Sequence, residues 1–556
     1  MLNRRVFLAV LTNQMMLPFK TALGNLLRVT ALVAGLTFLS DVGLAAPACT
    51  TDMTPYLGSL NVTGMGAAII KHGQVQCTTA AGNAISGNLS GWTLGAGTTA
   101  PFYPSPTGTQ KHAGSWSALL GAPTIAQVGD SRMYQTVTLP AGQAATLTFW
   151  YRPFSANTIT YAWQEAQVQD NLGNKLAQIF KVASNSKRWT QVTFNLTPYA
   201  GRTVRIHFNA YSNGGGYPMN TPTGMYLDDV SVTAGGQQLI QNGGFETEQG
   251  TPYTADTAQT LASVSKSVVA TAVMQLYEQG RFSLDDPINN HLPFQVTIPS
   301  CAGTPITFRQ LLTHTASIKD NYTVTDRLIV QGDSPISLDS LMRGYFIAGG
   351  AYYSRTGNFY SSCPNRQYQY SNLGATLLAY LVQVISGQDF NQYATQHIFT
   401  PLGMTNTSFL YSGVNRVTLA MPYTARNGDA FGLYGYPDYP DGTLKTSVTN
   451  LAKFLAMFAN GGSYNGQQIL QPSTVALILS QQTTLNRTVV SQGLIWYETG
   501  EFATNLWGHS GLDFGINTNM FFSPTSTEGV ILFANGQGAA SEAPLVNALL
   551  AEAHTY

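Results

Sequence analysis

Charged residues are scarce in this chain. Only 10% of the 556 residues are Asp, Glu, Lys or Arg, and 27 basic side chains balance 27 acidic ones. No Lys/Arg cluster occurs beyond the N-terminus, so the electrostatic footprint that phosphate binding needs is missing and we expect no nucleic-acid partner. Glycine and aromatic residues are plentiful, which is typical of β-rich exported proteins.

Long apolar runs are missing after the N-terminal region. No later stretch reaches the ~18 apolar residues that a membrane helix needs, so we expect a soluble mature protein without a membrane span. The N-terminus itself carries Arg4 and Arg5, an apolar run over 29–39 and small residues over 45–48. This order predicts a removable signal peptide over residues 1–48 and a periplasmic or secreted protein.

The leader is long, and two explanations stay open. The residues from Arg4 to Leu8 resemble a twin-arginine export motif, whose leaders have extended basic regions. Alternatively, translation starts at Met15 or Met16, which would leave an ordinary secretory peptide.

Cysteine is also rare. The four cysteines are Cys49, Cys77, Cys301 and Cys363, and an even number in an exported chain predicts disulfides with three pairings open. Cys49 is alternatively a lipoprotein cysteine, although the proline nearby departs from the usual lipobox.

The length exceeds what one ordinary domain core covers, so we expect two folded units and an export segment. Residues 62–82 alternate like a β-hairpin with His72-Gly73 at the bend. Between about 82 and 250, short alternating runs separated by Gly, Pro, Asn and Ser predict an all-β sandwich; the clearest runs are 145–151, 190–194 and 204–208. Helical periodicity begins after Gly250.

The middle segment contains four short motifs: SGWT at 90–93, LPAG at 139–142, YLDDVSV at 226–232 and NGGFE at 242–246. On these motifs it resembles the carbohydrate-binding-type jelly-roll modules of secreted bacterial proteins, in which NGGFE normally precedes SGW. The permuted order brings both ends of the module to one place. We therefore expect residues 84–249 to be inserted into a surface loop of one host domain.

A serine and a lysine three residues apart begin the first helical segment. Ser263 and Lys266 share one helix face, and the apolar residues that follow, up to Gly280, predict a buried helix. Ser263 is then at a helix N-terminus, where backbone N–H groups favour a developing oxyanion. S-x-x-K alone is a weak signal, because Ser184 and Lys187 also fit it inside the β segment, among polar residues and without a following helix.

Residues 49–83 and 250–556 resemble the serine β-lactamase and penicillin-binding superfamily in its class C and esterase branch. The resemblance rests on S-x-x-K at 263–266, Y-S-N at 370–372 and H-S-G at 509–511, and on GTP at 250–252, LYEQG at 276–280, LDDP at 284–287, LLTHT at 311–315, PLGM at 401–404 and WGHSG at 507–511. It implies an α+β serine β-lactamase-like fold, with a helical domain against a five-stranded antiparallel sheet flanked by helices, here with the inserted all-β jelly-roll domain.

The resemblance also implies roles for individual residues. Ser263 would attack the acyl carbonyl, and Lys266, buried and either neutral or hydrogen-bonded, would help to deprotonate it. Tyr370 would pass the proton to the leaving group and activate the deacylating water. Asn372 would orient Lys266 and the substrate, and the backbone N–H groups of Ser263 and Leu512 would form the oxyanion hole.

Further expectations concern the cysteines and His314. We favour the pairs Cys49–Cys77 and Cys301–Cys363, because each lies within one segment of the hydrolase region. His314 serves structure in this superfamily and is left out of the site. No metal or cofactor is expected for the hydrolysis.

The third motif departs from the β-lactamase pattern. His509, Ser510 and Gly511 stand where many β-lactamases have Lys-Thr-Gly, and a histidine with an ordinary pKa near 6.5 is largely neutral at pH 7. Efficient β-lactam hydrolysis is therefore in doubt. If the His509 imidazolium binds a substrate carboxylate, activity on such substrates should fall as pH rises. The chain also offers no glutamate that we can place as a class A deacylation base.

The sequence thus predicts an exported serine hydrolase that forms an acyl-enzyme on esters or amides, as an esterase, a D-amino-acid peptidase or a DD-peptidase-like enzyme. β-Lactamase activity proper is one alternative. An alternative of another class is a non-catalytic carbohydrate- or cell-wall-binding protein on a hydrolase scaffold.

Two features of the β segment suggest ligands. Trp92, Trp150, Tyr151 and Trp163 either stack on sugars, giving a glycan partner, or fill the sandwich core. Asp229 and Glu246 are candidates for a structural Ca²⁺, although two carboxylates fall short of the six to eight oxygens that Ca²⁺ takes.

Overall fold

The computed structural model describes residues 46–85, 89–96, 104–123, 128–215, 221–246, 250–415, 419–502, 504–536 and 541–556. The predicted signal peptide therefore lies almost entirely outside the described residues. Within them, no helix combines the length and the apolar character needed to cross a membrane.

An antiparallel sheet forms the centre of the part built from residues 49–85 and 250–556. Its five longer strands are those that the superfamily resemblance implies, and three short strands extend it at the two edges. In spatial order the strands are β14 (Thr251–Pro252), β2 (Gln74–Ile85), β1 (Gly64–Lys71), β25 (Gly529–Ala534), β24 (Ile516–Phe522), β23 (Leu506–Asp513), β22 (Tyr497–Thr499) and β21 (Ser491–Gln492). The expected hairpin is present as β1 and β2, with His72 and Gly73 both at positive φ in the bend.

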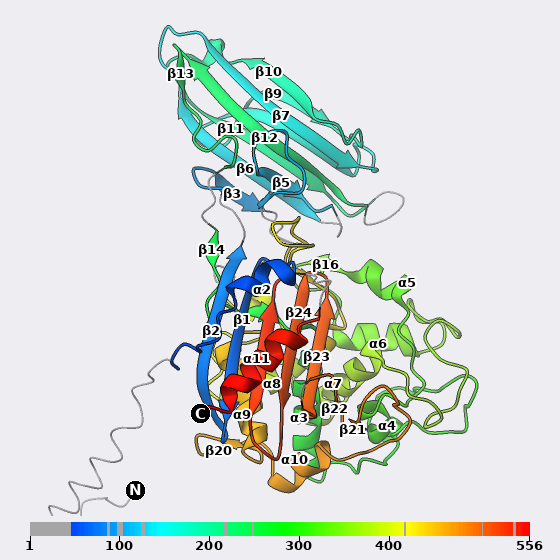
Figure 1. Cartoon of the computed structure of the whole chain (residues 1–556). Helices are drawn as coiled ribbons and strands as arrows, with labels where there is room; N and C mark the ends of the chain where they lie inside the picture. Colours follow the sequence, from blue (N-terminus) through cyan, green and yellow to red (C-terminus); the bar gives the residue numbers. More distant parts are fainter. Residues whose placement is uncertain are drawn as a thin grey trace, which may run out of the picture. The chain divides into compact units, whose positions relative to one another are not determined.

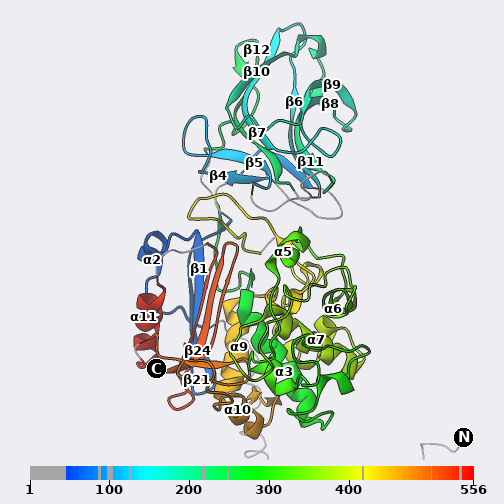
Figure 2. The ribbon, with the colours of Figure 1, turned by 90° about the vertical axis from the view of Figure 1, so that its right-hand side faces the viewer.

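Helices cover both faces of this sheet. On one face α11 and α2 pack against β1 and β25, and on the other α9, α3 and α7 form the larger core (Figures 1 and 2). The helices are α2 (Thr54–Ser59), α3 (Ser265–Glu278), α4 (Phe308–Leu312), α5 (Tyr322–Thr325), α6 (Leu338–Phe346), α7 (Asn372–Ser386), α8 (Phe390–Ala394), α9 (Val448–Ala459), α10 (Pro472–Ile478) and α11 (Ala543–Ala553).

Local sequence explains where the two central helices begin and end. The hydroxyl of Ser371 accepts a hydrogen bond from the Gly374 N–H and caps α7, and Gly387 closes that helix in the left-handed conformation. Gly280 lies just beyond α3 with φ +67°, at the place where the sequence predicts the helix to stop. A glycine at positive φ thus follows each of the two helices at its C-terminal end.

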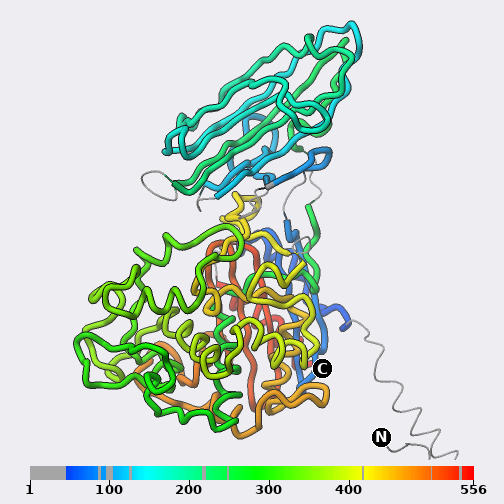
Figure 3. Tube along the Cα trace, turned by 180° about the vertical axis from the view of Figure 1, so that it is seen from behind, coloured from blue at the N-terminus to red at the C-terminus, as the bar shows by residue number. Residues whose placement is uncertain are grey.

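Residues 93–238 form two further sheets with a hydrophobic core of their own, which contains Trp92, Phe149, Phe208 and Phe245. Figure 2 shows the two layers edge-on and Figure 3 traces them from behind. One sheet runs β10 (Thr190–Asn195), β7 (Ala145–Ser155), β12 (Thr223–Ala234), β5 (Ser117–Gly121) and β4 (Ser105–Thr107), with β13 (Gln237–Gln238) beside β12. The other runs β3 (Thr93–Ala96), β6 (Gly129–Thr138), β11 (Thr203–Ser212), β8 (Ala162–Asp170) and β9 (Lys175–Val182).

The chain leaves the catalytic sheet and returns to it at one point. Strand β2 ends at Ile85, and Thr251 of β14 pairs with Ile85. The permuted motifs also meet, because the Trp92 indole N–H donates to the Asn242 carbonyl oxygen at 3.2 Å. A β-sandwich can therefore be inserted in the chain between β2 and β14 while the two strands stay paired.

Both cysteine pairs favoured from the sequence are bonded. Cys49 is joined to Cys77 and Cys301 to Cys363, and no described cysteine is free. The first bond leaves Cys49 no thiol for lipid attachment, which removes the lipoprotein alternative in this structure. Two disulfides also indicate a chain that folds outside the reducing cytoplasm.

Candidate active site

Ser263 lies in a short 3₁₀ turn, η2 (Ala262–Val264), that leads directly into α3. Ala262 has φ +49°, a left-handed conformation that costs a residue with a Cβ about 1–3 kcal/mol. The turn is held from two sides. The Leu261 N–H donates to the Leu444 carbonyl oxygen at 2.8 Å, and the Thr518 hydroxyl donates to the Leu261 carbonyl oxygen at 2.6 Å. The surrounding strands thus fix the direction of the Ser263 side chain.

Lys266 is completely buried, and its ammonium group faces the serine. Its Nζ donates to Ser263 Oγ at 3.0 Å and to the Asp441 carbonyl oxygen at 2.7 Å. Burial by itself would lower the pKa of Lys266, but the neighbouring Tyr370, Asp441 and Asp320 outweigh it, and the net shift of the pKa is upward. Of the two forms the sequence left open, the structure favours the charged, hydrogen-bonded lysine.

Asp320 holds the Tyr370-Ser371-Asn372 segment, and the sequence analysis missed it. Its carboxylate accepts hydrogen bonds from the Ser371 hydroxyl at 2.9 Å and from the backbone N–H groups of Asn372 at 2.8 Å and Leu373 at 3.0 Å. These are donors at the N-terminus of α7 that the helix itself cannot satisfy. Asp320 therefore fixes the start of α7 and with it the Tyr370 side chain.

His314 supports the same segment, in agreement with the structural role expected for it. Its Nδ1 accepts from the Ser371 N–H at 3.2 Å, and its ring lies 4.4 Å from the Tyr370 ring between centroids. Burial lowers the pKa of His314 well below the ordinary value, and the charge of Lys266 adds to this, so the ring is neutral. The Lys266 ammonium lies 5.2 Å from the centre of the Tyr370 ring.

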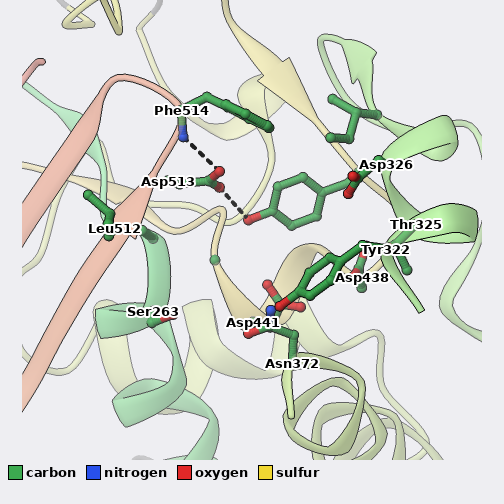
Figure 4. Close-up of a pocket in the computed structure, with 14 residues that line it drawn as sticks. Ser263, Tyr322, Thr325, Asp326, Asn372, Asp438, Asp441, Leu512, Asp513 and Phe514 are labelled. Atoms are coloured by element: carbon green, nitrogen blue, oxygen red, sulfur yellow. Dashed lines mark hydrogen bonds between the residues drawn. The ribbon is translucent and has the colours of Figure 1, made fainter. Parts of the chain in front are cut away.

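Strand β23 passes beside the nucleophile turn. A Cβ on Gly511 would lie 2.4 Å from the Leu261 carbonyl oxygen and 3.0 Å from the Ser263 nitrogen, so only glycine fits there. This close approach brings Leu512 to the same cavity as Ser263 (Figure 4). Ser510 is exposed, and its hydroxyl lies 2.8 Å from the Tyr497 hydroxyl.

His509 lies in the same strand but is buried. It is 4% exposed, and its Nδ1 is 2.6 Å from the Ser510 carbonyl oxygen. Burial lowers the pKa of His509 to about 3, and the Lys266 charge acts in the same direction. The imidazole of His509 is therefore neutral near pH 7. Its surroundings do not support a cationic His509 that binds a substrate carboxylate.

A cavity of about 350 Å³ opens beside the serine, a volume within the usual range for small-molecule sites. Among the predicted residues, Ser263, Asn372 and Leu512 line it, whereas Lys266, Tyr370 and His509 are not among its lining residues. Its other lining residues are Ala262, Tyr322, Thr325, Asp326, Ile329, Tyr436, Asp438, Asp441, Gly442, Asp513 and Phe514. Several were missed, although the doubled Tyr-Pro-Asp at 436–441 was a signal in the sequence.

The aromatic residues singled out in the sandwich are largely covered. Trp92 is in the core, and His112 stacks on Trp150 with 3.8 Å between centroids. Trp163 has Tyr211 stacked at 4.1 Å and the Lys181 ammonium 3.5 Å from its ring centre. These rings do not form an open sugar-stacking platform in this structure.

The two carboxylates considered for Ca²⁺ are occupied by protein groups. Asp229 lies 2.7 Å from His112 Nδ1, and Glu246 accepts from the backbone N–H groups of Ser115 and Trp116. Among the described residues, the one metal-like grouping of His, Cys, Asp and Glu is Cys49, Cys77 and Glu552, and its cysteines form a disulfide. The arrangement does not support the Ca²⁺ expectation.

The comparisons with known proteins place the chain in a family. The beta-lactamase family model matches residues 223–555, more than half of the chain. The putative penicillin-binding protein PbpX of Bacillus subtilis strain 168 is 26% identical over 333 residues, which are 57% of this chain and 73% of the relative. Protein flp of Staphylococcus aureus strain MW2 is 24% identical over 285 residues, which are 50% of this chain and only 52% of the relative.

A solved structure is similar as well. The octameric penicillin-binding protein homologue from Pyrococcus abyssi has a TM-score of 0.42 and 23% identity, over 55% of this chain and 67% of that chain. The chain belongs to the beta-lactamase family and is a serine hydrolase of the β-lactamase and penicillin-binding superfamily.

Proposed function

We propose that this protein hydrolyses esters or amides through an acyl-enzyme on Ser263. The observation that carries the proposal is the 3.0 Å hydrogen bond from Lys266 Nζ to Ser263 Oγ at the edge of the cavity. A buried cation beside a serine hydroxyl stabilises the alkoxide that attacks a carbonyl carbon. The backbone N–H groups of Ser263 and Leu512 would bind the resulting oxyanion.

Proton transfer falls to Tyr370 in this scheme. Because Lys266 is charged at rest, it cannot also accept the serine proton, and in this scheme the proton passes to the Tyr370 oxygen, whose ring centre lies 5.2 Å from the ammonium. Tyr370 then gives the proton to the leaving alcohol or amine. A water molecule attacks the acyl-enzyme, releases the acid and restores Ser263, with Tyr370 as the base.

Residues 1–48 are a signal peptide in this proposal, and the mature chain is periplasmic or secreted. The two disulfides support export, because they form and persist in oxidising compartments. β-Lactams are poor substrates in this scheme, because the neutral His509 cannot supply the fixed charge with which lysine binds their carboxylate.

The proposal treats residues 84–249 as an inserted carbohydrate-binding-like module. The pairing of Ile85 with Thr251 supports insertion. A glycan would meet the outer face of the sheet containing β8 and β11 rather than bare aromatic rings. Asn209 Oδ1, His207 Nδ1 and Trp163 Nε1 are buried there without partners among the described residues, so a glycan would reach them only after covering side chains such as Lys181 move aside.

The test is p-nitrophenyl butyrate hydrolysis by the purified protein, with a chromogenic cephalosporin in parallel and a fluorophosphonate probe for labelling. Ser263→Ala should abolish labelling and lower ester turnover by about 10⁴-fold or more. Ser184→Ala removes the serine of the other S-x-x-K sequence and serves as the matched control, which should keep both signals. Unchanged labelling of Ser263→Ala would overturn the proposal.

A second outcome would favour the non-catalytic alternative. No turnover of either substrate, combined with glycan-array binding by the full chain that Asn209→Ala and His207→Ala remove, would make the sandwich the functional part. Ester turnover with little cephalosporin cleavage would instead favour an esterase or amidase.

A further inference from the structure

The cavity beside Ser263 is lined by carboxyl groups and has no cationic side chain among its lining residues. Asp326, Asp438, Asp441 and Asp513 all line it (Figure 4). Such a wall would repel a substrate carboxylate of the kind that a lysine in the place of His509 would bind. The charge of this pocket therefore points to a different substrate class.

One carboxyl oxygen in this wall is conspicuously unsatisfied. Asp438 is 6% exposed, and its Oδ1 is buried without a donor at hydrogen-bond geometry among the residues that the structure describes, although the Asp441 side chain interacts with the same carboxyl group. Burying a carboxylate oxygen without a donor is costly, and native proteins rarely leave one so. A donor supplied by a ligand in the cavity would satisfy it.

The other carboxyl groups already have fixed positions. Asp513 accepts hydrogen bonds from the Tyr436 hydroxyl at 3.1 Å and from the Phe514 N–H at 2.8 Å, which Figure 4 marks with dashed lines. The Asp441 carbonyl oxygen accepts from Lys266, and its side chain lies near the Thr376 hydroxyl. The wall is thus a built surface rather than a set of mobile surface acids.

The carboxyl groups around the cavity outnumber the cations near them. Lys266 is the cation that interacts electrostatically with Asp441, Asp438 and Asp513. The two nearby histidines, His314 and His509, are neutral because burial lowers the pKa of each. Burial also raises the pKa of Asp438 to about 7 and that of Asp441 well above its ordinary value, so this pair holds protons that a second cation would displace.

We propose that the acidic wall of the cavity binds an ammonium group of the substrate near the scissile bond, so that the enzyme prefers amine-bearing esters or amides and rejects carboxylated ones. This inference rests on the proposed function, since it names the substrate class of the same site. The ammonium donates to Asp438, and the exposed Asp326 and the lining Asp513 add attraction. Uncharged substrates still react, but bind less tightly.

The kinetic test compares substrates that differ in charge. Alanine p-nitroanilide, in both enantiomers, carries an ammonium on the acyl side, and its N-acetyl and N-succinyl forms are neutral and anionic. 2-(Dimethylamino)ethyl butyrate, protonated at neutral pH, against the neutral isostere 3-methylbutyl butyrate places an N–H cation on the leaving-group side. In one of the two series we expect kcat/KM to be at least about tenfold higher for the cationic substrate than for the neutral one. The series that shows this preference identifies the side of the scissile bond that the acidic wall contacts. The anionic substrate should have the lowest kcat/KM. Equal values in both series, or a preference for the anion, would overturn the inference.

Variants then locate the effect. Asp438→Asn should reduce the ratio of cationic to neutral kcat/KM by about tenfold or more, mainly through KM. Asp285→Asn is the control, because Asp285 pairs with Arg309 and does not line the cavity. A ratio that Asp438→Asn leaves unchanged would contradict the assignment.

A binding measurement separates this inference from the proposed function. Calorimetry with the Ser263→Ala protein compares alaninamide with the neutral propionamide, and requires no turnover. Tighter binding of alaninamide, lost in Ser263→Ala/Asp438→Asn, supports the ammonium site even if hydrolysis fails. Equal binding of the two amides alongside normal hydrolysis of p-nitrophenyl butyrate overturns the ammonium site alone.

Discussion

The chain contains two S-x-x-K segments, and they have opposite surroundings. In the first, Lys266 is fully buried on α3 and bonds to Ser263. In the second, Lys187 is exposed at φ +52° in the link between β9 and β10, where its backbone N–H donates to the Pro153 carbonyl oxygen. The same spacing thus builds a site on a helix and an ordinary loop in a sandwich.

The difference shows what the motif needs beyond its letters. A helix directs residues three apart to one face, and burial keeps a short amine close to a hydroxyl in a medium where charge interactions are strong. The link after β9 provides neither condition. Y-S-N also occurs twice, at 370–372 and at 211–213 in the sandwich. The two sequences show the same contrast, because Tyr370 lies beside Lys266, whereas Tyr211 stacks on Trp163.

Removing each lysine in turn is the strongest test of the difference between the two S-x-x-K segments. Lys266→Met keeps the length of the side chain but removes the charge that faces Ser263, and we expect kcat to fall by about 10³-fold. Lys187→Met should leave kcat within about twofold. Both are measured by p-nitrophenyl butyrate hydrolysis, with circular dichroism to show that Lys266→Met still folds. Comparable losses in the two variants would show that burial is not what distinguishes the segments.

A smaller effect is expected from the carboxylate that fixes α7. Asp320→Ala leaves the Ser371 hydroxyl and two backbone N–H groups without their acceptor, so we expect kcat to fall by about tenfold and the free energy of unfolding by roughly 2 kcal/mol. Asp389→Ala is a matched cap removal on α8, where the side chain accepts from the Gln392 N–H. It should cost about 1 kcal/mol of stability and leave kcat unchanged.

Denaturant unfolding and kinetics on the same preparations check both variants. If Asp320→Ala lost only stability, Asp320 would be an ordinary cap and would have no role in positioning Tyr370.

The smallest effect concerns His509 and pH. A histidine with a pKa near 6.5 would lose its charge between pH 5.5 and 7.5. An enzyme that used this charge to bind a substrate carboxylate would lose its activity on carboxylated substrates over the same pH range. Because burial lowers the pKa of His509 to about 3, the imidazole is already neutral above about pH 4. Asp438, whose pKa burial raises to about 7, also titrates in this window, so the test uses the Asp438→Asn protein. In that protein the ratio of kcat/KM for anionic and neutral p-nitrophenyl esters should change by less than about twofold between pH 5.5 and 8.

The measurement is a pair of pH–rate profiles with the two esters. A ratio that falls about tenfold per pH unit around pH 6.5 would restore the cationic role that the sequence left open for His509.

Much of the fold was predictable because its signals are local. Alternation and the His72-Gly73 bend predict the hairpin, and alternating runs predict β7, β10 and β11. The short strands β14, β21 and β22 were not predicted from sequence pattern. Each has only two or three residues, too few to show a period, and is defined by its pairing with a neighbour.

The candidate site divides in the same way. Ser263 and Lys266 were predicted from their spacing, because a helix places residues three apart on one face, whereas Tyr370 and Asn372 were implied by the Y-S-N motif of the superfamily resemblance. Asp320 was not found, because its partners lie about 50 residues away and no spacing rule connects them.

The sequence by itself determined the chemistry available to this protein: a serine and lysine on one helix face, a glycine where β23 must approach the nucleophile, and an even set of cysteines. Only the tertiary structure determined which of these groups are charged. Burial keeps His509 neutral, and neighbouring groups keep Lys266 charged. The carboxyl groups of Asp438, Asp441 and Asp513 gather around one cavity because β23 and the 436–442 loop meet there, and protonation depends on distances that no linear pattern contains.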